Sequence, residues 1–325
     1  MGRLDFARGM IGKAWQSPAR LLAGESEVSF VTGVGRNPKM ARSAQASTKG
    51  PAVPRACIFC QQPGRMTKEH IWGDWLKAHI APTMNKHNMQ AVRINQPGQP
   101  TTGNTLLRAG DPLRSTVRVV CADCNNQWLS GIQSRAKPIL IPLIKGDRTV
   151  LGIEAQQRVS AWCAMATMTA EFIDRDPNTI AVPQADRDWL RNNGTAPPGW
   201  RIWLARYRRH KWPAQWAHFT LPILEAKDVP APGTGFVPPN TQVTTFVVGE
   251  LYVHVMSSVD LENINGWATR LSFSERRLVC IHPAKESFIV WPAPSLTDKD
   301  ADNIASAFHR YVEGISRSLS GRRLF

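Results

Sequence analysis

The stretch VRVVCADCNNQW, residues 117–128, decides the fold because it places three structural signals in a row. Its first part alternates apolar and polar residues, which predicts a β-strand running into Cys121 and Cys124. Two cysteines with a two-residue gap can both face one ion at tetrahedral angles. From Asn125 the sequence has helical character, and we expect Pro138 to end the helix because proline lacks a backbone N–H. The stretch therefore predicts a strand, a metal-binding turn and a helix, in that order.

A second Cys-x-x-Cys pair lies upstream, at Cys57 and Cys60. Two such pairs predict a structural zinc site in which Cys121 and Cys124 supply the other thiolates. The gap between the pairs is much longer than the roughly 15 to 20 residues that are usual for such a site. Residues 81–115, which are rich in Asn, Gln, Pro, Gly and Thr, are therefore interpreted as an insertion that loops out of the compact unit.

The composition predicts a globular protein with a polyanionic partner. The chain has 325 residues, 42% of them hydrophobic, enough for one large domain or two medium ones. Its 40 Lys and Arg against 25 Asp and Glu give a formal charge of +15, which favours nucleic acid, although an anionic membrane surface would select the same imbalance. The sequence lacks both a long apolar run and a secretory signal, so we expect a cytoplasmic protein that is not embedded in a membrane.

The order of segments predicts an α+β protein in three parts. Residues 1–55 are basic and are interpreted as a flexible N-terminal arm; residues 1–39 fall outside the native product if Met40 is the true start. Residues 56–148 hold both cysteine pairs and should depend on the metal for their order. Residues 149–325 are interpreted as a mixed α+β domain whose role the sequence does not identify.

This last part carries alternating strand patterns and two helical ones. A helix is expected around Val159–Ile173, and another is expected to begin at Thr297, with Asp300 completing its cap. The third and fourth strands should form a hairpin with Gly249 at the first position of a two-residue turn, and the last two strands should form a further hairpin. The expected strands are residues 200–207, 217–223, 243–248, 251–257, 277–283 and 287–292.

Glu69 and His70 follow the first cysteine pair in RMTKEHIW, residues 65–72. Hydrolysis of a phosphodiester needs a deprotonated water in line with the phosphorus and a cation beside the phosphate. Histidine accepts a proton near neutral pH, and a carboxylate is a ligand for a hard divalent ion. Asn125 can add a neutral oxygen ligand. Because neighbouring side chains of a strand point to opposite faces, a bend is needed for Glu69 and His70 to reach one site.

The segments CIFC, TKEHIWGDWL and VRVVCADCNNQW together resemble the zinc-containing branch of the HNH endonucleases, over roughly residues 55–145. The resemblance implies a ββα-metal, treble-clef-like core and metal-dependent cleavage of nucleic acid, with DNA as the expected substrate. It implies His70 as general base and Glu69 and Asn125 as ligands of a catalytic Mg²⁺ or Mn²⁺, with Asn126 as the alternative to Asn125. The four cysteines, Cys57, Cys60, Cys121 and Cys124, are implied as structural zinc ligands.

The chain also departs from the pattern of this family. Glu69 stands where the family usually has Asp, and the final position, often His, is Asn125. The family's central Asn, which orients the general base, is assigned to Asn104, with Asn88 and Asn95 as alternatives. Three further polar residues are interpreted as surface residues, although either histidine could complete the active site: Asp74, His79 and His87.

A basic segment with flanking aromatic residues, RYRRHKW, is typical of contacts to nucleic-acid phosphates, although a charged loop after a strand would have the same composition. Its candidate phosphate contacts are Arg206, Arg208, Arg209 and Lys211. Cys163 and Cys280 lie in apolar runs and are expected to be buried free thiols. The alternative function is a zinc-dependent nucleic-acid-binding protein without catalysis, and a third is an interaction protein that uses the nuclease-like part as a scaffold. The oligomeric state is left open.

Overall fold

The structure is a computed structural model. It describes residues 56–81, 87–93, 102–108, 111–173, 179–208, 216–222, 237–260, 265, 278–292, 295–305 and 307. In 87–93 and 102–108 only the backbone is described. The predicted N-terminal arm, residues 1–55, lies outside the described residues, and so does Met40, the alternative start.

The stretch VRVVCADCNNQW, residues 117–128, forms the predicted strand, turn and start of a helix. Strand β4 (Thr116–Cys121) pairs antiparallel with β1 (Met66–His70), and Met66 lies opposite Cys121. Three helical segments follow without a break: α1 (Ala122–Cys124), the π-helix η3 (Asn125–Leu129) and α2 (Ser130–Lys145). Two short 3-10 helices, η1 (Asp74–Ala78) and η2 (Pro112–Arg114), lie between β1 and β4 in the chain.

The prediction that Pro138 ends the helix was wrong. Helix α2 continues through Pro138 and Pro142 to Lys145 and stops at Gly146, whose left-handed backbone (φ 74°) suits a residue without a side chain. Each proline removes one backbone hydrogen bond. Burial of one apolar side of the helix offsets this loss; the buried residues are Ile132, Ala136, Leu140, Leu143 and Ile144.

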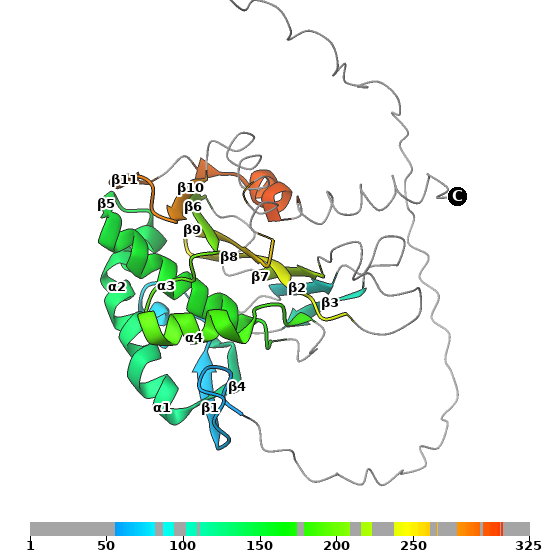
Figure 1. The fold of residues 1–325 in the computed structure, drawn as a ribbon. Helices are drawn as coiled ribbons and strands as arrows, with labels where there is room; N and C mark the ends of the chain where they lie inside the picture. Colours follow the sequence, from blue (N-terminus) through cyan, green and yellow to red (C-terminus); the bar gives the residue numbers. More distant parts are fainter. Residues whose placement is uncertain are drawn as a thin grey trace, which may run out of the picture. The chain divides into compact units, whose positions relative to one another are not determined.

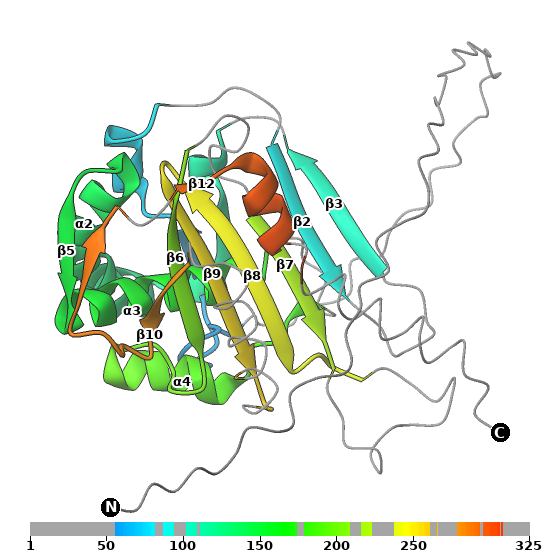
Figure 2. The ribbon, with the colours of Figure 1, turned by 90° about the horizontal axis from the view of Figure 1, so that it is seen from above.

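The largest element of the described chain is an eight-stranded mixed sheet, and Figure 2 shows most of its strands lying side by side. Its strands, in spatial order, are β10 (Val279–His282), β6 (Arg201–Tyr207), β9 (Leu251–Ser258), β8 (Thr241–Val248), β7 (Trp216–Leu221), β2 (His87–Arg93) and β3 (Thr102–Arg108), and β12 (Ser295–Leu296) pairs with β6. Most of the strands predicted beyond residue 149 are confirmed in this sheet.

Two described parts of the predicted insertion, 87–93 and 102–108, are strands of the large sheet and do not loop out of the compact unit. Strands β2 and β3 form an antiparallel pair, and β2 runs parallel to β7, with Met89 opposite Trp216. This pairing gives hydrogen-bond partners to backbone groups of β7 that would otherwise be unpaired at the edge of the sheet. The described residues, from 56 onward, all belong to one compact unit.

One predicted hairpin is confirmed and the other is not. Strands β8 and β9 are joined by Gly249 and Glu250, and Gly249 has φ 60°. A side chain at Gly249 would also collide with α2, because its Cβ would lie 2.5 Å from the Ile144 carbonyl oxygen. Strand β10 pairs instead with β6, and β11 (Phe288–Trp291) pairs with β5 (Thr149–Gly152). The two strands that were expected to pair with each other, β10 and β11, therefore pair with β6 and β5 instead.

Helices cover both faces of the large sheet (Figure 1). On one face α3 (Ile153–Ala170), which is buried on nearly all sides, packs beside α2 and α4 (Gln184–Asn193), and Trp162 of α3 contacts Phe246 of β8 at 5.9 Å between ring centroids. On the other face, residues 298–305 pack through Ala301 and Ile304.

The described chain mixes helices and sheets, as predicted for an α+β protein. The predicted cap of the last helix is confirmed, since the backbone N–H of Asp300 donates to Thr297 Oγ1 (3.3 Å) and that of Thr297 donates to the Asp300 carboxylate (2.9 Å). None of the helices in the described ranges has the length and apolar character that crossing a membrane would require.

Candidate metal centre and the polar residues beside it

The four predicted zinc cysteines converge on one point. The Sγ atoms of Cys57, Cys60, Cys121 and Cys124 all lie within 4.8 Å of one another, and those of Cys60 and Cys121 are 3.6 Å apart. The first pair lies in a tight turn that is tied to β4, because the Ile58 N–H donates to the Val119 carbonyl oxygen (3.0 Å). This group of cysteines can hold a metal ion, and zinc fits a set of four thiolates.

The ionisation of the four cysteine thiols explains why a cation would be stabilised between them. Burial raises the pKa of Cys57, but hydrogen bonds from the backbone amides of Cys60, Cys121 and Phe59 outweigh it and bring the pKa to about 7. Burial, with the neighbouring thiols, raises the pKa of Cys124 to about 12. Without a cation, the sulfurs cannot all carry a negative charge side by side. A divalent ion would allow all four to ionise.

The cysteine cluster is continuous with the main core of the described chain. Phe59, between the first two cysteines, is fully buried and meets Trp128 of η3 edge-on at 4.9 Å. The Gln184 side chain of α4 donates to the Phe59 carbonyl oxygen (3.2 Å). The turn that carries Cys57 and Cys60 is therefore fixed to the helices as well as to β4.

The polar residues of β1 face the helical segment through two contacts. The Asn125 amide donates to Thr67 Oγ1 (2.9 Å) and to the Lys68 carbonyl oxygen (3.3 Å). Two helical turns further on, the Gln133 amide donates to Glu69 Oε1 (3.3 Å). Glu69 is only 3% exposed, and this burial raises the pKa of its carboxyl to about 7. Both β1 and the start of the helix thus present polar groups to each other next to the cysteines.

His70 points away from this contact. Its Nε2 lies 3.2 Å from Asp74 Oδ1 of η1, and Lys77 pairs with the same carboxylate. Burial lowers the pKa of His70, and the negative charge of Asp74 counteracts part of that shift. Asp74 is exposed, as predicted, but it is also the partner of the proposed general base. Among the described contacts, no hydrogen bond joins Glu69 or His70 to Asn125.

The remaining candidates for this site lie apart or at its edge. Asn126 is exposed, directly after Asn125. His79 packs at the edge of the Trp75 ring, with centroids 6.0 Å apart. Asn104 and Asn88 belong to β3 and β2, where Asn104 is opposite Ala91 and Asn88 opposite Leu107. His87 begins β2, and Asn95 lies outside the described residues.

The four predicted phosphate contacts have different surroundings, and two of them lie outside the described residues. Arg206 is a member of β6 and its Nε donates to Glu250 at 2.6 Å, so its charge is already paired. Arg208 is exposed after the end of β6. Arg209 and Lys211 lie outside the described residues. Of the two other cysteines, Cys163 is buried as predicted, whereas Cys280 is only partly buried.

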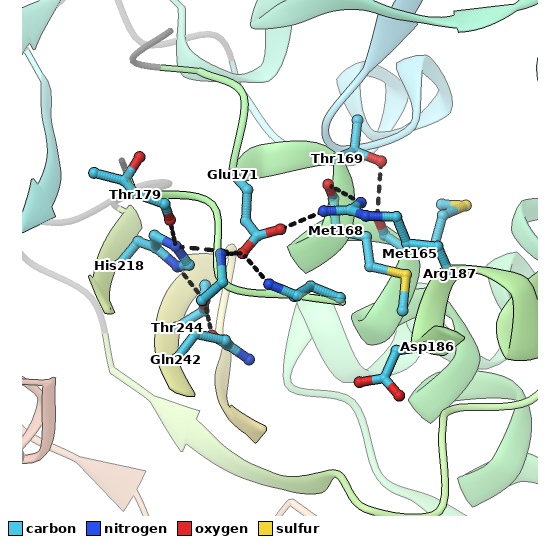
Figure 3. Close-up of polar contacts among 12 residues, drawn as sticks. Met165, Met168, Thr169, Glu171, Thr179, Asp186, Arg187, His218, Gln242 and Thr244 are labelled. Carbon is cyan, nitrogen blue, oxygen red and sulfur yellow. Dashed lines mark hydrogen bonds and ion pairs between the residues drawn. The ribbon is translucent and has the colours of Figure 1, made fainter. Parts of the chain in front are cut away.

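A buried polar cluster that the sequence did not predict lies between α3, α4 and the sheet (Figure 3). Arg187 of α4 donates from Nη2 to Glu171 at 2.5 Å, and both side chains are almost fully buried. The other Glu171 oxygen accepts the backbone N–H groups of Ala181 (2.9 Å) and Val182 (3.0 Å) and lies 3.7 Å from His218 Nε2. The one signal was a carboxylate, Glu171, directly after the apolar run of α3.

No family model matches the chain, and no match was found among curated proteins or solved structures. The class of site therefore rests on its own geometry, which defines a candidate four-cysteine metal centre.

Proposed function

We propose that the protein is a zinc-stabilised, metal-dependent endonuclease of the HNH type. One observation supports the proposal above others: Asn125, which follows Cys124 at the start of the helix, donates to Thr67 and Lys68 of β1, the strand that carries Glu69 and His70. The order of cysteine turn, two antiparallel strands and helix agrees with a ββα-metal, treble-clef-like core. Structural zinc in the cysteine centre would fix these elements.

The proposed reaction is hydrolysis of a phosphodiester bond in nucleic acid, with DNA as the first substrate to test. Because His70 Nε2 faces the Asp74 carboxylate, Nε2 carries the proton of the neutral ring and Nδ1 is left to accept a proton from water. Glu69 and Asn125, with Asn126 as the alternative to Asn125, would hold the catalytic Mg²⁺ or Mn²⁺. When bound, that ion neutralises charge on the phosphate and the leaving oxygen.

The basic character of the chain, with a net charge of +15, supports nucleic acid as its partner. Near pH 7 the Glu69 carboxyl exchanges between its protonated and ionised forms, since its pKa is about 7. A carboxylate ligand is therefore available at neutral and alkaline pH. Arg208, Arg209 and Lys211 are proposed as further phosphate contacts, whereas Arg206 would first have to leave Glu250.

A second function is favoured by a different observation. Glu69 and His70 engage separate partners, Gln133 and Asp74, on opposite sides of β1. This arrangement suits a zinc-dependent nucleic-acid-binding protein that does not cut its ligand. In that case the dyad would only tie β1 to α2 and η1.

Cleavage of plasmid DNA, and of RNA, with Mg²⁺ or Mn²⁺ tests both functions. We expect the parent protein to cut and His70→Ala at equal zinc content to lose cutting, whereas His79→Ala should retain it. The absence of cutting by the parent protein with either ion and either substrate would reject the nuclease. Binding without cutting would then favour the second function, and the absence of binding at moderate salt would favour an interaction scaffold.

A further inference from the structure

Helices α2, α3 and α4 lie side by side (Figure 1), and a surface cavity of about 220 Å³ opens between them. Its apolar floor includes Ile132 of α2 and Ala161 of α3. Its polar walls carry Arg135 of α2, Arg158 and Glu154 of α3, and Thr195 just after α4. The cavity thus joins cationic and hydroxyl groups from three segments, none of which the proposed active site uses.

Arg135 is available to a ligand. Within the described chain it makes no hydrogen bond and no ion pair, and its side chain is exposed. Its guanidinium reaches from α2 across the cavity toward the end of α4, because a Cβ placed on Gly194 would lie 3.5 Å from Nη2. A guanidinium in this position can offer two parallel N–H donors to the oxygens of an anion.

Thr195 adds a hydroxyl donor to the same cavity. Its Oγ1 accepts a hydrogen bond from the Trp189 indole N–H (3.3 Å), and an indole can only donate. The hydroxyl hydrogen of Thr195 must therefore point elsewhere, and it is free to donate to a bound group. Trp189 itself is 39% exposed, which is unusual for so large an apolar side chain, and its indole N–H contacts Thr195 of the cavity wall.

The charge of the cavity indicates the kind of anion. Arg158 donates to Glu154 at 2.5 Å, so this carboxylate offsets one of the two guanidinium groups. Two positive charges and one negative charge leave an excess of one positive charge. A phosphodiester carries a single negative charge, whereas a terminal phosphate carries up to two at neutral pH. The balance favours the internal phosphate of a nucleic-acid strand.

We propose that this cavity binds a phosphodiester group of a nucleic-acid strand through Arg135 and Thr195, with an adjoining base against the Trp189 ring. The identity of the strand as nucleic acid rests on the proposed function, while the anion chemistry rests on the cavity itself. Base stacking on an exposed aromatic ring next to a phosphate contact is the usual mode of binding for single strands.

Fluorescence anisotropy of a labelled single-stranded oligonucleotide tests the proposal, with the full-length zinc-loaded protein and no added Mg²⁺ or Mn²⁺. Arg135→Gln should weaken binding about tenfold and lower the salt slope by about 0.7. Thr195→Val should weaken binding by a smaller factor. Glu154→Gln raises the cavity charge by one and should strengthen binding. Arg148→Gln removes the same charge from another exposed site beyond the end of α2, and it should have less than about a twofold effect.

Equal effects of Arg135→Gln and Arg148→Gln would overturn the proposal, since they would show only the general attraction of a basic chain. Weaker binding by Glu154→Gln would overturn it as well, even if Arg135→Gln proved unstable in a thermal melt. Unlabelled mononucleotide and inorganic phosphate are used as competitors; if either competes as well as an unlabelled strand, the ligand is a free phosphate and the strand is rejected. Because the assay measures binding alone, its outcome is independent of whether His70→Ala abolishes cutting.

Discussion

The Gln133 amide of α2 donates a hydrogen bond to the buried Glu69 carboxylate of β1 across 3.3 Å, and it is the one side chain that does so among the described residues. Glu69 is only 3% exposed, so water cannot take the place of this donor freely. The contact therefore joins the strand that carries the proposed dyad to the helix that follows the cysteines.

Gln133→Ala is expected to destabilise the fold by leaving the Glu69 carboxylate without a donor. The loss should be about 1–3 kcal/mol in the free energy of unfolding, measured by urea denaturation at pH 8, where the carboxyl is mostly ionised. Gln127→Ala changes an exposed glutamine on the adjoining segment η3 and should stay within about 0.5 kcal/mol. Equal losses in the two variants would show that the Gln133 contact has no special weight.

The four-cysteine group could be predicted from the sequence because the spacing within each pair restricts the geometry of the sulfurs. Glu69 and His70 were predicted as one dyad, and period-two alternation along β1 explains why they face different partners. Gln133 could not be found in this way. Its role depends on how α2 crosses β1, and no local pattern in the sequence encodes that crossing.

In the fold, the elements with strong local signals were predicted best. The β8–β9 hairpin follows from Gly249 at a two-residue turn, and the last helix from the cap at Thr297. The parallel pairing of β2 with β7 joins segments more than a hundred residues apart, and neither segment identifies its partner. Helix α2 passes Pro138 because tertiary burial outweighs local propensity, which a single-sequence pattern does not measure.

Loss of the metal should unfold the region around β1 and β4. We expect about one zinc ion per chain by elemental analysis, and Cys124→Ser should abolish this stoichiometry. The free energy of unfolding should fall by about 5 kcal/mol or more, with loss of the near-ultraviolet circular dichroism that Trp128 contributes beside Phe59. Cys163→Ala removes a buried thiol outside the centre, so it should retain the zinc. Full zinc content in Cys124→Ser would contradict the four-cysteine centre.

Breaking the buried pair of Glu171 and Arg187 should cost far more than breaking an exposed pair. Arg187→Met leaves the Glu171 carboxylate without its cation, and we expect a loss of about 3–5 kcal/mol by chemical denaturation. Arg158→Met breaks the exposed pair with Glu154 and should cost less than about 1 kcal/mol. The double variant Glu171→Gln, Arg187→Met should recover part of the loss, because no charge is then left unpaired. A loss below 1 kcal/mol in Arg187→Met would show that the pair contributes little.

His254 should make the fold less stable as the pH falls. It is fully buried on β9, its Nδ1 lies 2.8 Å from Thr245 Oγ1, and Nε2 has no hydrogen-bond partner among the described residues. Burial lowers its pKa from the ordinary 6.5 to about 3. Below pH 6.5 the His254 ring therefore binds a proton in the unfolded chain, whereas in the folded chain it stays neutral down to about pH 3. The free energy of unfolding is therefore unaffected by His254 above pH 6.5 and decreases as the pH falls below it.

The expected slope from His254 is about 1.4 kcal/mol of unfolding free energy per pH unit between pH 6 and pH 4. His254→Gln has no titrating ring and should reduce the measured slope by that amount, whatever the other histidines contribute. His79→Gln, in a partly exposed position, should leave the slope nearly unchanged. If the slopes of His254→Gln and the parent protein were equal, the buried ring would already be protonated in the folded state, and Nε2 would then need an acceptor that the described contacts do not contain.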